Sequence, residues 1–201
     1  MYVRINTIFG EKSKIDAAVE YIEESDRPVV EAAAGNSGLL TLVDREAGLI
    51  VAASYWDEPL HSSEAVLTRV REGAVAVAGG DLSVESFEVA AQQQPAATPP
   101  GAAVRFARMQ IELARFDEAI SFFDEQVLPA LTACAGLCSI QLLLDPGSGS
   151  GIVATAWQDL AAADAAEEAM ARLHSSATSR GGVKFLNVEP YTLVRTSMRL
   201  S

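Results

Sequence analysis

The chain has 201 residues, of which 49% are hydrophobic and 21% are charged, the composition of an ordinary folded protein. Acidic residues outnumber basic ones by 27 to 15, which gives a formal net charge of −12. Nucleic acids and anionic membrane surfaces are bound through clustered lysine and arginine, so this charge argues against both as partners. No run of residues approaches the ~20 apolar residues that a membrane-spanning helix needs.

The start of the chain and its cysteines indicate a cytoplasmic protein. The sequence MYVRINTIFGEKSK has no basic segment followed by an apolar one, so we expect no secretory signal. Cys134 and Cys138, the two cysteines, have a spacing that matches neither a redox pair nor a zinc site. We expect two reduced thiols and no bound metal, because two histidines in the whole chain are also too few for a metal cluster.

A change of composition divides the sequence near its middle. Residues 92–103 read QQQPAATPPGAA, without charge or large apolar side chains, and their prolines disfavour helix. We therefore predict a first domain over residues 1–91, a linker over 92–103 and a second domain over 104–201.

The two sides of this linker match each other at a constant offset of 101 residues. The matching segments are 3–5 with 104–106, Asp44 with Asp145, and 51–57 with 152–158. Both tryptophans of the chain, Trp56 and Trp157, fall at one matched position. We predict an internal duplication with a period too long for a solenoid repeat.

Each half shows the same order of expected elements. In the first half, alternation and β-branched runs predict strands over 2–9, 39–43, 49–56 and 83–91, with helices from residue 15 and over 64–78. In the second half, strands are expected over 104–111, 137–144, 152–157 and 183–195, with helices from residue 116 and over 161–177. The order β-α-β-β-α-β is that of a ferredoxin-like domain.

A ferredoxin-like sheet carries its helices on one face and leaves the other face in need of a partner. A second copy in the same chain can supply that partner. We therefore predict an α+β protein with two tandem ferredoxin-like domains, packed sheet to sheet as an intrachain α+β barrel.

The second half also resembles a known family. It contains Ala135-Gly136-Leu137 before a strand that ends in Leu144-Asp145-Pro146, then a glycine-rich turn and a strand that closes in Trp157-Gln158-Asp159. This pattern is similar to the antibiotic-biosynthesis-monooxygenase domains of the dimeric α+β barrel superfamily. The first half has Gly38, Asp44 and Trp56 at the matching places but lacks the proline.

The resemblance implies a range of activities. Some members oxygenate quinol-like aromatics without metal or flavin, some degrade haem, some are similar to chlorite dismutases, and others have no known activity. Members usually pair as homodimers, so this chain is expected to be either a monomeric pseudo-dimer or a homodimer.

Cofactor-free oxygenation needs a base and groups that stabilise a substrate anion. The candidates for catalysis are Asn6, His61 and His174, and those for substrate binding are Trp56, Trp157 and Arg108. The histidines, the tryptophans and Arg108 have structural alternatives: an exposed histidine at a helix end, a tryptophan that fills the core, and an arginine that pairs with a glutamate.

Haem degradation is disfavoured by the same residues. The resemblance implies an asparagine in the first strand together with a tryptophan and a histidine on the second helix. Asn6 fits this position, but Trp56 and Trp157 end strands, and Ala107 replaces the asparagine in the second half.

The sequence therefore leaves two alternative functions. The first is a monooxygenase of this type, without a cofactor, that acts on an apolar aromatic or quinol-like small molecule. The second is a non-catalytic ligand-binding or assembly protein with the same fold.

Overall fold

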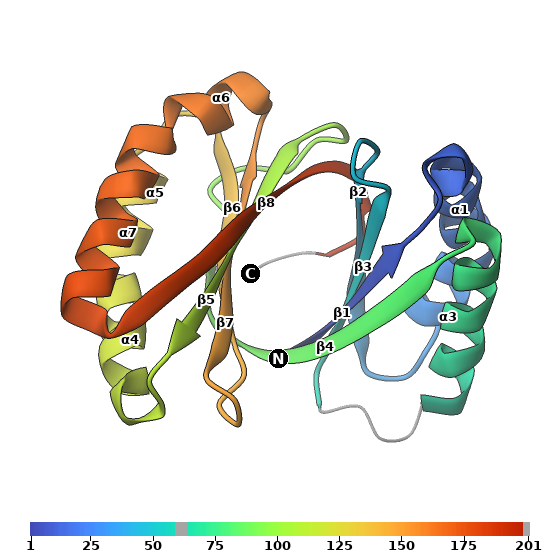
Figure 1. Ribbon diagram of the computed structural model, residues 1–201, viewed down its shortest axis with the longest axis horizontal. Coiled ribbons are helices and arrows are strands. Elements are labelled where there is room, and N and C mark those ends of the chain that lie inside the picture. Colours follow the sequence, from blue (N-terminus) through green and yellow to red (C-terminus); the bar gives the residue numbers. More distant parts are fainter. Residues whose placement is uncertain (59–63, 199–201) are drawn as a thin grey trace. The chain divides into compact units, whose positions relative to one another are not determined.

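The structure, a computed structural model, describes residues 1–58 and 64–198 (Figure 1). Its contacts divide the chain into two compact units. Unit 1 contains Met1–Ser86 and the segment that begins at Leu193, and unit 2 contains Phe87–Thr192. Unit 1 thus includes the end of the second half of the sequence, and unit 2 includes the end of the first half.

Unit 1 is built from four strands and the helical segments between them. Its strands are β1 (Tyr2–Phe9), β2 (Asn36–Asp44), β3 (Leu49–Trp56) and β4 (Asp81–Gln93), of which β4 passes into unit 2 at Phe87. Its helical segments are η1 (Lys12–Lys14), α1 (Ile15–Tyr21), η2 (Ile22–Asp26), α2 (Arg27–Glu31) and α3 (Glu64–Ala78).

Unit 2 has the corresponding elements in the same order. Its strands are β5 (Ala103–Ile111), β6 (Leu137–Leu144), β7 (Ser150–Trp157) and β8 (Val183–Thr196), of which β8 passes into unit 1 at Leu193. Its helical segments are η3 (Leu113–Arg115), α4 (Phe116–Phe122), η4 (Phe123–Val127), α5 (Leu128–Thr132), α6 (Leu160–Ala165) and α7 (Glu167–Gly181).

Hydrogen bonds link the strands of the first half in the order β4-β1-β3-β2 and those of the second half in the order β8-β5-β7-β6. In each half of the sequence this is the spatial order fourth, first, third, second, which is the ferredoxin-like arrangement. The α+β class and the ferredoxin-like order predicted from the sequence are confirmed. The corresponding pairs keep the same register, because Arg4 faces Ser54 across β1 and β3 and Arg105 faces Thr155 across β5 and β7.

Helices cover one face of the sheet in each unit, and the core lies between the two layers (Figure 1). In unit 1, Ile8, Ile22 and Ala78 share a buried apolar cluster from β1, η2 and α3. In unit 2, Phe123, Leu131 and further side chains of the helices pack on β5, β6 and β7. Burial of each such side chain contributes about 1.5–3 kcal/mol to the stability of its unit.

The first helix of each half of the sequence widens into a π-helical turn, at η2 and at η4. Pro28 and Pro129 follow these turns, and a proline has no N–H for the usual bond four residues back. The preceding N–H groups bond five residues back instead, from Arg27 to the Ile22 oxygen and from Leu128 to the Phe123 oxygen. The wide turn brings its last residue, Asp26 or Val127, into a buried position.

Some boundaries differ from those expected. The helix predicted over 161–177 is two helices, α6 and α7, which meet at Ala166. Strand β4 runs to Gln93 and β5 begins at Ala103, so both ends of the predicted linker belong to strands. The predicted division into 1–91, 92–103 and 104–201 follows the sequence. The compact units have other boundaries, because the end of β4 belongs to unit 2 and the end of β8 belongs to unit 1.

None of the helices in the described part of the chain is long and apolar enough to cross a membrane.

Candidate functional site

The two tryptophans are fixed by the same hydrogen bond in both units. Trp56 donates from Nε1 to Ser54 Oγ at 2.9 Å, and Trp157 donates to Thr155 Oγ1 at 3.0 Å. Residues two apart on a strand share a face, so the hydroxyl and the indole lie side by side. Both side chains are 1–2% exposed, and the hydroxyl partner removes the cost of burying an indole N–H.

Unit 2 contains a pocket of about 290 Å³ between its sheet and the helices α6 and α7. This volume lies at the lower end of the range for small-molecule sites, about 300–1,000 Å³. Apolar walls come from Trp157, Met170 and Val188, whereas polar and charged groups come from Arg105, Thr155, Asp164, Glu167 and His174. The pocket thus combines an apolar lining with a few polar groups, which is typical of a ligand site.

His174 lies on α7 and is half-buried at this pocket. Its ring stacks on Phe185 with 4.0 Å between the ring centroids and 29° between the planes. Burial lowers the pKa of His174, because the charged imidazolium loses hydration there. The imidazole is therefore neutral at neutral pH, and one ring nitrogen can accept a proton.

Arg105, on β5, supplies positive charge to the same pocket. Its Nη2 is 3.7 Å from Asp164 Oδ1, and its side chain is 22% exposed, whereas that of Asp164 is 62% exposed. Such a long contact with an exposed carboxylate is a weak ion pair. The guanidinium can therefore exchange this carboxylate for an anionic ligand.

Arg108, the arginine selected from the sequence, is not among the residues that line this pocket. It is three residues after Arg105, so the alternation of the strand points it to the opposite face of the sheet. There its Nε donates to Glu189 Oε1 at 2.7 Å, and the Tyr191 hydroxyl donates to the other oxygen of Glu189. The structure shows Arg108 in the ion pair that was its structural alternative.

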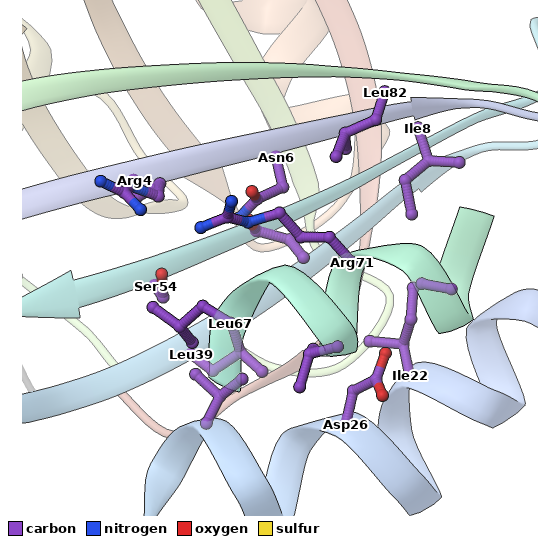
Figure 2. Close-up of a pocket in the computed structure, with 14 residues that line it drawn as sticks. Arg4, Asn6, Ile8, Ile22, Asp26, Leu39, Ser54, Leu67, Arg71 and Leu82 are labelled. Carbon is purple, nitrogen blue, oxygen red and sulfur yellow. The ribbon is translucent and has the colours of Figure 1, made fainter. Parts of the chain in front are cut away.

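Unit 1 has a smaller pocket of about 40 Å³ at the corresponding place, between β1, β3 and the helices (Figure 2). Polar side chains of Arg4, Asn6, Asp26, Ser54 and Arg71 line it among apolar ones. In Figure 2, Arg71 extends from α3 toward Asn6 on β1, and Asp26 points toward the pocket from the opposite side. Asn6 donates from Nδ2 to the Ala52 oxygen at 3.2 Å.

Asp26 is an acidic group at this pocket with a strongly raised pKa. It is 5% exposed, and burial raises its pKa to about 7. Within the described structure, Asp26 Oδ2 and Asn6 Oδ1 are buried without a hydrogen-bond partner. Val127 occupies the corresponding place at the end of η4, so this buried carboxyl belongs to unit 1 alone.

The two pockets share a pattern of basic groups. Arg4 and Arg105 occupy the same place on the first strands. Arg71 and His174 each precede by eight residues the glycine, Gly79 or Gly182, at which the chain turns with positive φ after the helix. Each pocket thus has one cation from its first strand and one basic side chain from its second helix.

The site residues selected from the sequence do not gather in one pocket. Asn6 lies in the pocket of unit 1, and His174 and Trp157 lie in that of unit 2. Trp56 packs against Val30, Leu39 and Leu67 in the core of unit 1. His61 lies outside the described residues.

No family model matches the chain. Over its whole length the chain is similar to two uncharacterised proteins of Mycobacterium tuberculosis. It is 26% identical to one over 202 residues, which cover 90% of that protein, and 23% identical to the other over 203 residues, which cover 86%. These relatives carry no stated activity.

Solved structures share the fold at low sequence identity. A protein from Lactobacillus acidophilus, described as a proposed monooxygenase, has a TM-score of 0.70 and 9% identity, covering 96% of this chain and 93% of its own. An anthrone oxidase-like protein has a TM-score of 0.67 and 16% identity, covering 97% and 92%. A ferredoxin-fold protein from Listeria monocytogenes, related to antibiotic biosynthesis monooxygenases, has a TM-score of 0.57 and 9% identity, covering 96% and 95%. The chain has the fold of antibiotic-biosynthesis-monooxygenase-like proteins, as its sequence pattern indicated.

Most polar residues of the two pockets were not among the candidates selected from the sequence, and Arg105, Ser54, Thr155 and Asp26 are examples. Arg105 could have been identified from the sequence, because it lies 101 residues after Arg4. Ser54 and Thr155 could also have been identified, because each lies two residues before a tryptophan. Asp26 gave no such signal, because it lies in the run EESDR, which reads as a solvated helix face.

Proposed function

We propose that the pocket of unit 2 binds an apolar aromatic, quinol-like molecule and catalyses its oxygenation by O₂ without metal or flavin. The observation that carries this proposal is the presence of a neutral histidine, His174, and a weakly paired arginine, Arg105, in one apolar pocket beside Trp157. The fold similarity to an anthrone oxidase-like protein supports the substrate class.

His174 acts as the general base in this scheme. Its neutral ring accepts a proton from the acidic hydroxyl or methylene of the substrate, which leaves an electron-rich anion. Burial in an apolar pocket keeps the imidazole unprotonated before the substrate arrives. The stacking contact with Phe185 fixes the plane of the ring.

Arg105 stabilises the negative charge that develops on the substrate oxygen. A guanidinium in a partly dry pocket interacts more strongly with an anion than it would in water. Thr155 Oγ1 already accepts the Trp157 N–H, so the indole is held as a flat apolar wall for an aromatic ring.

Atoms and electrons balance with O₂ as the only other reactant. In an anthrone-like substrate, the methylene carbon loses two hydrogens and gains one oxygen atom as a carbonyl. The second oxygen atom leaves as water with those two hydrogens. The substrate supplies the electrons that reduce O₂, so the protein needs only the base and the anion-stabilising group.

Oxygen uptake with a panel of anthrones and quinols, with and without a metal chelator, tests the proposal. The wild-type protein is expected to consume one O₂ per ketone formed, equally with and without chelator. The His174→Gln variant is expected to lose at least 100-fold of this activity, since general base catalysis contributes roughly 10²–10⁴-fold. The Arg105→Gln variant is expected to lose a similar factor, since one anion-stabilising donor contributes roughly 10²–10³-fold.

The matched control is Arg172→Gln, because Arg172 lies on the same helix but is 66% exposed and pairs with Glu168. It should keep wild-type activity. Ligand binding at the pocket without oxygen uptake would contradict catalysis and support the binding protein instead. Full activity in His174→Gln would remove His174 from the reaction.

A further inference from the structure

The hydroxyl of Thr155 can still donate a hydrogen bond into the pocket of unit 2. Thr155 lies on β7, is 1% exposed and lines this pocket. Its Oγ1 accepts a hydrogen bond from Trp157 Nε1 at 3.0 Å, and the hydroxyl makes no other hydrogen bond within the described part of the chain. A threonine hydroxyl has one donor besides its acceptor sites. An acceptor in the pocket would satisfy this buried donor.

Arg105 is the direct neighbour of Thr155 on the sheet. The two residues are opposite each other in the register of β5 and β7, and both line the pocket. Directly opposed side chains project from the same face of a sheet, with their Cβ atoms about 4.5–5.5 Å apart. Arg105 contacts the Val104 carbonyl oxygen at 3.3 Å and the exposed carboxylate of Asp164 at 3.7 Å. The sheet wall of the pocket thus carries a charged donor and a neutral donor side by side.

The general base proposed for this pocket comes from its helical side. His174 lies on α7 and lines the same pocket as Arg105 and Thr155. When a base removes a proton from an anthrone or a quinol, the negative charge develops on the oxygen atom of the substrate. Donors that are already in place where this charge develops lower the barrier of such a step.

We propose that Thr155 is a further catalytic residue of unit 2, and that its hydroxyl donates a hydrogen bond to the same substrate oxygen that Arg105 stabilises. This inference rests on the proposed oxygenation, because it assigns a second anion-stabilising donor to that reaction. The N–H of Trp157 occupies an acceptor site of Oγ1 and thereby restricts the direction of the O–H. It also polarises the hydroxyl, because hydrogen bonds in a chain strengthen one another.

Unit 1 supplies a matched control for this hydroxyl. Ser54 Oγ accepts the N–H of Trp56 at 2.9 Å, as Thr155 does for Trp157. The pocket that Ser54 lines has a volume of about 40 Å³, which leaves no room for an aromatic ring system. Ser54→Ala therefore removes the corresponding structural hydrogen bond without removing a donor to the substrate.

Oxygen uptake with anthrone is the first test. Thr155→Val keeps the shape of the side chain but has no hydroxyl, so kcat should fall about 100-fold, since loss of one such donor costs roughly 10²–10³-fold. KM should change little, because the hydrogen bond strengthens as the charge develops. Thr155→Ser keeps the hydroxyl and should retain most of the wild-type rate, as should Ser54→Ala. Circular dichroism confirms that each variant is folded.

A double-mutant cycle separates this role from a merely structural one. If Thr155 only accepts the Trp157 N–H, its hydroxyl has no function once Trp157→Phe has removed that N–H. Thr155→Val in the Trp157→Phe background would then leave kcat unchanged. We expect that it lowers the kcat of Trp157→Phe by at least about 10-fold, because the hydroxyl also serves the substrate.

The aromatic alcohol 2-naphthol tests the same hydrogen bond without turnover. Its absorbance changes on ionisation, and under nitrogen it reports how strongly the pocket stabilises a bound aromatic oxyanion. In wild type, the bound hydroxyl should ionise at lower pH than it does in free solution. In Thr155→Val, the ratio of bound naphtholate to naphthol at a fixed pH should fall about 10-fold, since one pKa unit is a factor of ten. Thr155→Ser and Ser54→Ala should keep the wild-type ratio.

Wild-type kcat in folded Thr155→Val, or a wild-type naphtholate ratio in this variant, would overturn the role of Thr155. An unchanged kcat in the double-mutant cycle, or a wild-type protein that binds no naphthol, would reject it equally. Failure of the oxygenation itself looks different. In that case wild type takes up no O₂ with any anthrone, while a naphtholate ratio that depends on Thr155 still identifies its hydroxyl as the anion donor.

Discussion

Replacing Asp26 by asparagine should change how the stability of the protein depends on pH. Burial raises the pKa of Asp26 from 3.8 to about 7 in the folded chain. The folded state therefore binds more protons than the unfolded state between these values, and this carboxyl makes the protein less stable as pH rises through that range. A shift of about three pKa units corresponds to about 4 kcal/mol, at 1.36 kcal/mol per unit.

Asparagine has nearly the same shape and cannot ionise, so Asp26→Asn should lack this loss. Relative to wild type, its free energy of unfolding should rise by about 4 kcal/mol between pH 4 and pH 8. Asp26→Val, which introduces the residue found at the corresponding place in unit 2, should show the same trend. Comparing variant with wild type at each pH cancels the titration of all other carboxyl groups.

Urea unfolding followed by tryptophan fluorescence at four pH values between 4 and 8 measures this difference. Asp124→Asn is the control, because Asp124 lies in the corresponding π-helical turn of unit 2 and is exposed. Its difference from wild type should not vary with pH. A difference between Asp26→Asn and wild type that stays constant from pH 4 to pH 8 would refute the reasoning.

Further predictions concern the other buried polar groups and the base. Thr155→Val leaves the Trp157 N–H buried without its acceptor, so it should lower the free energy of unfolding by about 1–3 kcal/mol in urea titrations. An unchanged midpoint would show that water replaces the hydroxyl. Arg27 is 2% exposed and pairs with Glu23 and Glu31. Arg27→Leu should therefore lower the free energy of unfolding by about 3–5 kcal/mol in the same assay. An unchanged free energy of unfolding would show that the two carboxylates become hydrated in the variant. Oxygenation by wild type should rise with pH through the lowered pKa of His174 and then level off, and a rate that falls over this range would exclude a neutral base.

The order of elements was predictable because periodicity survives in both halves. Alternation in residues 2–9 and the apolar stripe from Phe116 onward correctly indicated a strand and a helix. The π-helical turns before Pro28 and Pro129 were not predicted, since no periodic signal distinguishes them from α-helix. The helix break at Ala166 was also missed, because an alanine-rich run favours continuous helix.

The site was only partly predictable, and the reasons are physical. His174 and Asn6 line pockets in different units, as their places in the two halves of the sequence implied, but the sizes of these pockets depend on tertiary packing. Arg105 and Arg108 differ by an odd number of positions on one strand, so they lie on opposite faces of the sheet, and Arg105 lines the pocket of unit 2. Asp26 is buried by the widened turn beneath α3, a consequence of tertiary packing rather than of local pattern.

The most direct test of the central claim is a crystal structure of the protein with bound anthraquinone, the ketone product of an anthrone. The account predicts that the ring system lies in the unit 2 pocket against Trp157, with its carbonyl oxygen near Arg105 and His174. Anthraquinone bound elsewhere on the chain, while this pocket remains empty at saturating concentration, would contradict the assignment of the site.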